Sequence, residues 1–241
     1  MNTLYGFGGN SNDALNPLGG LTSGGDGDFY GASQMGGGTL CQDNGCGAAF
    51  RITPAGNENV LTSLTMTQGD QPYGTLILGT DGNFYGTAIY GGSPVHRVCG
   101  SGCGTVFRFT RAGVFTTLHR FEGPDGEFPN GGLVQGTDGN FYGTAFGGGL
   151  LNEGTIYKLS LGLSPFVKAL PYAGPVGGNV TLLGTNLTGA TSVKFNGAEA
   201  AFTVVSPTEI STTVPAGGTT GSIAVVTPGG TLFSGFRFTV R

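Results

Sequence analysis

The sequence lacks several residue types and patterns that would indicate other classes of protein. Tryptophan is absent, histidine occurs only twice, and charged residues make up 10% of the chain. Gly or Pro interrupts every window of about 11 to 18 residues that has apolar side chains at helical spacing, so we expect almost no α-helix. No apolar run approaches the roughly 18 residues of a membrane span, and no apolar signal-peptide core follows Met1. The sequence therefore predicts a chain without helices and without a membrane span.

The few charges are distributed unevenly along the chain. Before Pro165, twelve acidic residues face six basic ones, whereas from Pro165 onward four basic residues face two acidic ones. Neither part carries the basic stripe that binding to a phosphate backbone requires. We therefore do not expect nucleic acid as a partner.

Glycine and aromatic residues are abundant instead. The 241 residues include 50 Gly, 12 Pro, 17 Phe and 8 Tyr. Gly supplies the positive φ that tight turns between short strands need, and alternating runs such as residues 105–109 recur along the chain. An apolar fraction of 38% is more than disordered chains carry. Composition therefore predicts a folded, all-β protein.

One hexapeptide occurs three times, at residues 26–31, 81–86 and 138–143. Each copy begins with a turn signal, formed by Asp26-Gly27, Asp81-Gly82 and Asp138-Gly139. A Leu-containing segment before each copy and a Phe- or Tyr-containing segment after it complete a pattern of four short antiparallel strands, which is typical of a propeller blade. We expect a propeller-like domain over residues 1–163, with repeat one at about 16–70, repeat two at 71–127 and repeat three at 128–161.

The repeat is fullest at residues 132–144 and resembles the Gly-Leu-Val tandem repeats called GloVer repeats. These occur in bacterial surface or secreted proteins described as choice-of-anchor proteins. The resemblance covers about residues 1–160. It implies a location outside the cell or on its surface, and it brings no catalytic residue and no cofactor with it.

The third repeat stops after its third strand, near Leu161. The segment containing Thr3, Leu4, Tyr5 and Phe7 matches the fourth strand of repeat two at residues 117–123. Residues 3–8 are therefore predicted to complete repeat three, either in the same chain or in a neighbouring one, because propellers close by pairing strands from their two ends. Three blades are fewer than the usual four to eight, so self-association into a closed dimer or a polymer is the alternative to closure within one chain.

The four cysteines lie between the second and third strands of repeats one and two. Repeat three lacks both the cysteines and the longer connection that contains them. A disulfide that closes its own loop predicts this joint loss, so we favour the pairs Cys41 with Cys46 and Cys99 with Cys103, and an oxidising compartment. A four-thiolate zinc site is the alternative, although the usual ligand spacing is absent.

Proline residues separate short alternating segments after Pro165. About seven strands in this region predict a β-sandwich over residues 164–241. Residues 178–187, followed by 193–197, resemble an IPT/TIG immunoglobulin-like domain. The resemblance implies a role as a spacer or docking domain.

The sequence offers few residues for catalysis. His96 lies in a cysteine-bounded loop, and the repeats place Tyr5 and Thr65 at the position of His119. No Gly-x-Ser-x-Gly motif accompanies either histidine. The repeated aspartates are a candidate carboxylate pair for glycoside hydrolysis, and Asp26-Gly27-Asp28 is a candidate calcium motif, but an Asp-Gly turn is the simpler interpretation. An acidic loop with Glu122, Asp125 and Glu127, for which Asp70 is a partial counterpart, is a candidate cation or sugar site.

We therefore expect a non-enzymatic, extracellular structural or adhesive protein that associates with itself into oligomers or fibres. The alternative is a carbohydrate-binding module that recognises surface glycans through exposed tyrosines. The candidates for stacking on sugars are Tyr73, Tyr90 and Tyr172.

Overall fold

The computed structural model describes residues 1–10, 12–38, 41, 44–92 and 99–241. Strands and loops make up this part of the chain, which confirms the predicted all-β class. In the described residues there is no helix long and apolar enough to cross a membrane. The chain divides into an N-terminal module, Met1–Gln135 with Phe141–Leu159, and a C-terminal module, Gly136–Asn140 with Ser160–Arg241. Most of the C-terminal module thus follows Leu159, and the turn at residues 136–140 also belongs to it.

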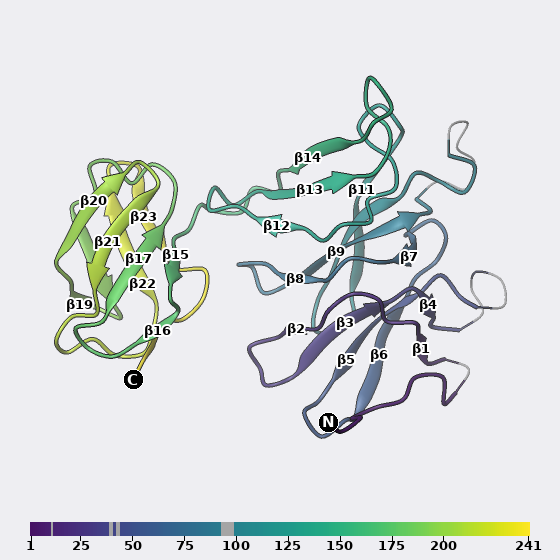
Figure 1. Cartoon of the computed structure of the whole chain (residues 1–241), viewed down its shortest axis with the longest axis horizontal. Helices are drawn as coiled ribbons and strands as arrows, with labels where there is room; N and C mark the ends of the chain where they lie inside the picture. The colour runs from purple at the N-terminus through teal and green to yellow at the C-terminus, as the bar shows by residue number, and fades with distance from the viewer. Residues whose placement is uncertain (11, 39–40, 42–43, 93–98) are drawn as a thin grey trace. The chain divides into compact units, whose positions relative to one another are not determined.

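The N-terminal module consists of three antiparallel sheets, one for each repeat (Figure 1). Repeat one contains β2 (Thr22–Ser23), β3 (Phe29–Ser33), β5 (Ala48–Ile52) and β6 (Glu58–Ser63), paired in that order. Repeat two contains β8 (Ile77–Leu78), β9 (Phe84–Tyr90), β10 (Thr105–Phe109) and β11 (Phe115–Arg120), with β7 (Asp70–Pro72) also on β9. Repeat three contains only β12 (Val134–Gln135), β13 (Phe141–Ala145) and β14 (Thr155–Leu159). A small pair, β1 (Ala14–Leu15) and β4 (Met35–Gly36), lies beside repeat one.

The repeated Asp-Gly step forms the turn between the short first strand and the long second strand of each repeat. Gly27, Gly82 and Gly139 have φ angles of 98°, 80° and 85°, a region that favours glycine. In each turn the aspartate Oδ1 accepts a hydrogen bond from the backbone N–H two residues later, at 3.1 to 3.2 Å. This is an Asx turn, so the sequence pattern and the local geometry have the same cause.

The glycine that ends each hexapeptide is needed for a different reason. A Cβ atom on Gly86 would lie 2.7 Å from Cζ of Phe107 on the neighbouring strand, and Gly31 meets Phe50 in the same way. The ring of the third strand lies flat across the second strand where no side chain stands. This close approach lets each thin sheet bury a large aromatic residue without a void.

Adjacent repeats pack face to face. Tyr30 of repeat one stacks on Phe84 of repeat two with ring centroids 4.0 Å apart, and Tyr85 of repeat two meets Phe141 of repeat three at 4.1 Å. Phe107 and Leu64 are buried in the cluster between repeats one and two. The hexapeptide aromatics thus form the core between repeats, at about 1.5 to 3 kcal/mol for each fully buried side chain.

The N-terminal segment does not complete repeat three within this chain. Residues 1–10 form no strand, and Tyr5 and Phe7 pack on the core of repeat one, where Phe7 contacts the ring of Phe50 at 5.2 Å. The expectation of pairing in the same chain is therefore wrong. The array of three repeats is open, so its two ends do not meet. Residues 3–8 lie on the sheet of repeat one, whereas β14 belongs to the sheet of repeat three. Pairing between two chains stays a prediction.

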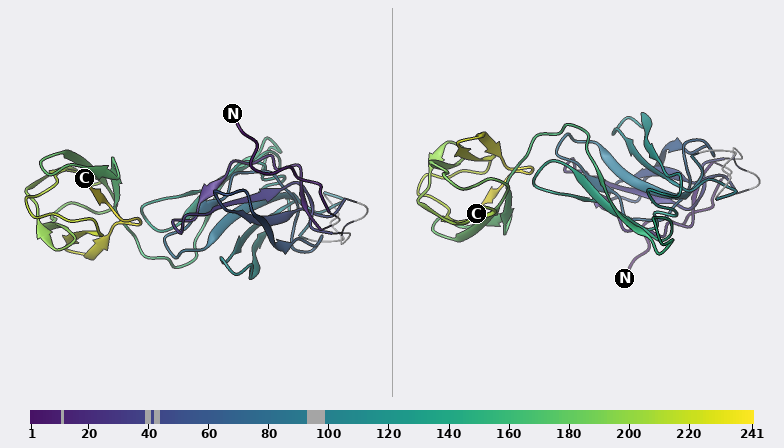
Figure 2. Two further views of the ribbon diagram at one scale, coloured as in Figure 1. Left: turned by 90° about the horizontal axis from the view of Figure 1, so that it is seen from below. Right: turned by 90° about the horizontal axis from the view of Figure 1, so that it is seen from above.

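The C-terminal module contains two four-stranded antiparallel sheets around one core (Figure 2). One sheet consists of β15 (Lys168–Leu170), β17 (Asn179–Leu183), β21 (Glu209–Thr213) and β20 (Phe202–Ser206). The other consists of β19 (Ala198–Glu199), β18 (Ser192–Phe195), β22 (Ile223–Thr227) and β23 (Gly230–Phe233). A parallel pair, β16 (Ala173–Gly174) and β24 (Thr239–Val240), completes the module. This is the predicted β-sandwich.

Candidate interaction site at the ends of the repeat array

Each repeat has two faces because side chains alternate along its strands. We call the face that meets the following repeat the forward face, and the face that meets the preceding repeat the backward face. Ala49, Val106 and Ile156 occupy the same position on the forward faces of repeats one, two and three, opposite Ala32, Thr87 and Thr144 on the adjacent strand. The two ends of the array are therefore the forward face of repeat three and the backward face of repeat one.

The forward face of repeat three is uncovered at the position that is buried in the other repeats. Ala49 and Val106 have no exposed surface, whereas 84% of Ile156 is exposed. The adjacent Thr144 is exposed too, although its counterpart Thr87 is buried. Exposed aliphatic surface on a face that packs elsewhere in the same chain indicates an interaction surface.

The backward face of repeat one is the complementary end. Phe29 is 36% exposed, while its counterparts Phe84 and Phe141 are fully buried against the preceding repeats. The N-terminal segment packs on part of this face, where Tyr5 and Phe7 contact the cluster of the buried Phe50. The forward face of repeat three and the backward face of repeat one are thus equivalent to the two faces that meet at the junction between repeats one and two.

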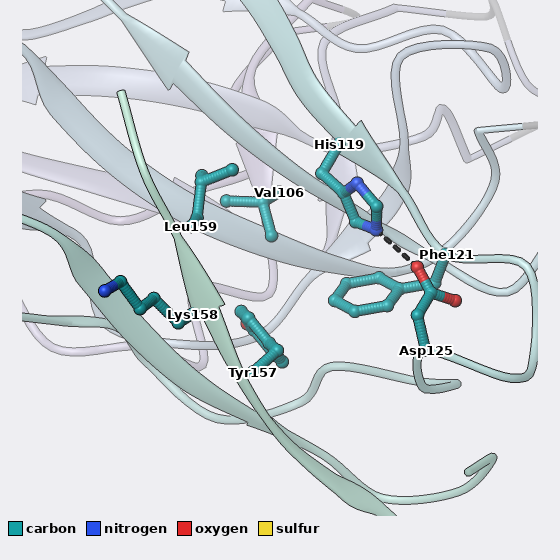
Figure 3. A pocket seen from close by; sticks show the side chains of 7 residues that line it. All are labelled: Val106, His119, Phe121, Asp125, Tyr157, Lys158 and Leu159. Atoms are coloured by element: carbon teal, nitrogen blue, oxygen red, sulfur yellow. Dashed lines mark hydrogen bonds and ion pairs between the residues drawn. The ribbon is translucent and has the colours of Figure 1, made fainter. Parts of the chain in front are cut away.

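A pocket of about 140 Å³ lies between β10, β11 and β14 (Figure 3). Its lining consists of Val106, His119, Phe121, Asp125, Tyr157, Lys158 and Leu159. His119 Nε2 lies 2.6 Å from Asp125 Oδ2, and the ring of Phe121 meets Tyr157 edge-on at 4.9 Å. Burial raises the pKa of Tyr157 far above its usual range, and within the described residues its hydroxyl has no hydrogen-bond partner. The pocket therefore lies beside β14, the strand at which repeat three ends.

The repeated aspartates are bound within their own turns rather than brought together. Tyr30 and Tyr85 donate hydrogen bonds to Asp26 and Asp81 at 2.8 and 2.7 Å. Arg111 of repeat two also lies 2.6 Å from Asp26 Oδ2, a contact between repeats that sequence spacing does not predict. Although partial burial opposes ionisation, the hydrogen bonds from Tyr30 and the backbone, with the charge of Arg111, hold the pKa of Asp26 below its usual value.

The same contacts raise the pKa of the tyrosines. Burial, followed by the hydrogen bond to Asp81 and its negative charge, raises the pKa of Tyr85 to about 12. The Asp and Tyr side chains of a hexapeptide therefore stabilise the turn and the inter-repeat core as a pair. Asp28 is likewise engaged by Arg51 at 3.5 Å, so neither carboxylate of the candidate calcium motif is left without a cation.

The cysteines pair within their own loops. Cys41 is bonded to Cys46 and Cys99 to Cys103, with Cα atoms 5.1 and 5.2 Å apart. Among the described residues, the metal-ligating atoms of Cys99, Cys103 and Glu127 form the one trio within 4.8 Å, and there the two sulfur atoms are joined to each other. The structure thus replaces the thiolate zinc site with two local disulfides.

The remaining candidate catalytic residues are the two histidines. His96 lies outside the described residues. His119 pairs in register with Val106, and Thr62 occupies the equivalent position opposite Ala49, so the alignment with Thr65 is wrong by three residues. Both fourth strands contain a β-bulge at this point, which sequence spacing alone does not show.

The residues of the acidic loop have separate partners. Asp125 contacts His119, and the backbone of Glu127 pairs with Gly147. The pKa of Asp70 is raised by burial, which makes its charged form less favourable. Sequence reasoning missed the forward face of repeat three, although the aligned positions of Ala49, Val106 and Ile156 contained the signal.

The fold and its ends define an open, all-β repeat protein with an appended β-sandwich. A family model described as the Gloeobacter/Verrucomicrobia repeat matches residues 1–205. The chain belongs to this bacterial repeat family, and the match extends beyond the three repeats into the C-terminal module. No curated protein matches the sequence significantly.

Two solved structures resemble the chain weakly. One is a fungal alcohol oxidase of the AA5 family in complex with copper, with 12% identity, a TM-score of 0.42, and coverage of 96% of this chain and 55% of that one. The other is a putative gluconolactonase, with 14% identity, a TM-score of 0.34, and coverage of 84% and 58%. The chain therefore spans little more than half the length of these proteins.

Proposed function

We propose that this protein is a non-catalytic structural component of the bacterial cell surface or extracellular space, and that it associates end to end with further copies of itself. The observation that carries the proposal is the contrast between Ile156, which is 84% exposed, and its fully buried counterparts Ala49 and Val106. Burying the same position at the end of the array requires another backward face. A second copy of this chain carries one at repeat one.

The covalent and compositional features agree with this role. Two disulfides suit an oxidising compartment, and the repeat family is one of bacterial repeat proteins. A contact between different faces of the two copies is heterologous, so it builds a ring or an open polymer rather than an isologous dimer. The C-terminal module, which resembles an IPT/TIG domain, would serve as a spacer or docking domain. Attachment to the cell would use an anchor that varies between family members, as in the choice-of-anchor proteins that the repeats resemble.

Sedimentation velocity over a range of protein concentrations tests the proposal. The unmodified chain is expected to form oligomers whose mass rises with concentration, and Ile156→Lys is expected to shift it to monomer. Val205→Lys is the matched control, because Val205 is an exposed aliphatic residue in the C-terminal module. A chain that is monomeric at every concentration, or equal assembly by both variants, contradicts the proposal.

Glycan binding is the second candidate. It is supported by the exposure of Tyr73 and Tyr172, whereas Tyr90 contacts the ring of Phe128 at 5.6 Å and is partly buried. Exposed tyrosine rings stack on sugars through their apolar faces. A glycan array with saturable binding that Tyr73→Ala or Tyr172→Ala abolishes would establish this function, and an empty array would remove it.

A further inference from the structure

We propose that residues 3–7 of a second copy add to the open edge of β14 as the fourth strand of repeat three. The inference rests on the proposed end-to-end association and specifies how the two copies join. In repeats one and two a fourth strand pairs with the third, β6 with β5 and β11 with β10, whereas β14 pairs only with β13 among the described strands. Edge strands present unpaired N–H and C=O groups that accept a further strand.

The N-terminal segment has the local geometry of the end of a fourth strand, although it pairs with none of the described strands of this chain. The N–H of Gly8, just after Phe7, donates to the carboxylate of Asp13 at 2.6 Å. In the same way the N–H of Glu122, just after Phe121, donates to Asp125 at 2.9 Å. The equivalent bond in repeat one runs from Thr65, after Leu64, to Gln68 at 3.0 Å. All three segments therefore end in the same cap.

Aromatic contacts show the same equivalence. Tyr5 meets Phe7 edge-on at 5.1 Å, and Phe7 meets Phe50 at 5.2 Å. At the end of β11, His119 meets Phe121 at 4.9 Å, and Phe121 meets Tyr157 at 4.9 Å. In both places an aromatic ring at the end of the segment packs on the third strand of the following repeat.

A third contact fixes the position of the segment along the sheet. A Cβ atom on Gly113 would collide with the carbonyl oxygen of Leu61, and a Cβ atom on Gly56 would collide with that of Leu4. Gly56 and Gly113 are the turn glycines between the third and fourth strands of their repeats. Leu4 therefore lies on repeat one as Leu61 of β6 lies on repeat two.

Neither residues 3–7 nor the outer edge of β14 pairs with another strand among the described residues. Residues 2–7 take part in no strand pairing within the described part of the chain, and Leu4 is exposed. The pocket beside Tyr157 lies on the acceptor side. In repeat two, Phe115 of the fourth strand stacks on Phe107, the counterpart of Tyr157, with centroids 5.0 Å apart. In a donated strand the residue at the position of Phe115 is Met1, whose side chain would lie over Tyr157.

The two complete repeats determine the register. Arg120 lies opposite Thr105, His119 opposite Val106, and a bulge at Leu118 brings Thr117 opposite Phe107. Repeat one has the same register and the same bulge. By equivalence, Gly6 of the second copy lies opposite Thr155, Tyr5 opposite Ile156, and Thr3 opposite Tyr157.

The charge on β14 is compatible with a paired strand. Lysine on an edge strand commonly opposes further pairing. The counterparts of Lys158 are Arg51 and Arg108, however, and both lie partly buried in strands that are paired on each side. A cationic residue at this position therefore fits within a complete repeat.

Intermolecular disulfide formation tests the register. Copies of the full chain carrying Tyr5→Cys and Ile156→Cys, half of them labelled with nitrogen-15, are mixed and oxidised under mild conditions. The expected result is a covalent ladder on a non-reducing gel and a mixed-isotope peptide linking positions 5 and 156. The matched control carries Gly9→Cys with Ile156→Cys, because a side chain at Gly9 meets open space roughly 13 Å further along the segment. The control is expected to stay unlinked.

The outcomes separate this inference from the proposed function. Equal linking by both pairs, or no linking in a chain that nevertheless forms oligomers, overturns strand donation and leaves end-to-end association standing. A chain that stays monomeric in sedimentation overturns both.

A backbone variant gives a second readout. Leu4→Pro removes an N–H that the donated strand would direct at β14, as Leu118 does toward β10, and we expect it to weaken association about tenfold. Its unfolding midpoint as a monomer should not change, because residues 2–7 make no strand pairs within the chain. Leu4→Val keeps the N–H and an apolar side chain, and should associate like the unmodified chain. Equal association by the two variants contradicts the proposal.

Discussion

The junction between repeats one and two and the open forward face of repeat three are built from the same sequence positions but have opposite exposure. At the junction, Tyr30 stacks on Phe84 and Ala49 lies in a closed apolar cluster. On the open face, Ile156 is exposed although it occupies the position of Ala49. The difference shows that a repeat of this kind buries its forward face only when another repeat follows it.

The largest expected effect comes from truncating an aromatic residue inside a junction. Phe84→Ala should reduce the free energy of unfolding by about 3 to 5 kcal/mol, because it removes a fully buried ring and leaves a cavity. Phe29→Ala at the equivalent, partly exposed position should cost clearly less. Urea unfolding of both variants below the concentration at which the chain associates measures the difference. Equal losses would mean that the two positions do not differ in burial.

A smaller effect is expected where a backbone approaches a ring. Gly86→Ala should destabilise the protein by about 1 to 3 kcal/mol, because its Cβ would lie 2.7 Å from both Phe107 and Leu76. Gly82→Asn is the control, since Gly82 has open space around it and asparagine tolerates positive φ. Thermal unfolding of the two variants compares packing with turn conformation. A neutral Gly86→Ala would contradict the close approach.

The disulfides distinguish repeats one and two from repeat three. Replacing Cys41 and Cys46 together by serine should cost about 2 kcal/mol, as chain entropy predicts for a short loop. Replacing Cys99 and Cys103 should cost a similar amount, because that loop is only one residue shorter. Denaturant unfolding with peptide mapping under non-reducing conditions tests both. A link between Cys41 or Cys46 and either cysteine of repeat two would contradict the pairing.

The last effect varies with pH and concerns Glu58 of β6, close to the N-terminal segment on repeat one. Burial, with the nearby charge of Asp13, raises the pKa of Glu58 to about 7 from 4.5. Because the folded state binds this proton more tightly than the unfolded state, its contribution to stability is largest below about pH 4.5 and is lost as pH rises through 7. Glu58→Gln should flatten this part of the profile of unfolding temperature against pH. An unchanged slope would show that Glu58 is not the titrating group.

The sequence was sufficient for everything that depends on local geometry. The Asp-Gly steps at residues 26–27, 81–82 and 138–139 form turns with positive φ, since this follows from the absence of a Cβ atom and the reach of the aspartate side chain. Three repeats, the missing fourth strand of repeat three and a C-terminal sandwich were also predictable. Strand alternation and turn residues specify these features over a few residues at a time.

Tertiary structure alone decided which of these surfaces are covered. Residues 3–8 match a fourth strand in sequence, yet within the chain they lie on repeat one, because three repeats do not bring the two ends of the array together. The bulge that aligns His119 with Thr62 likewise depends on pairing with a neighbouring strand. Alternation places Ile156 on the same face as Ala49 and Val106, but whether that face meets water depends on a partner far away in the chain or in another copy.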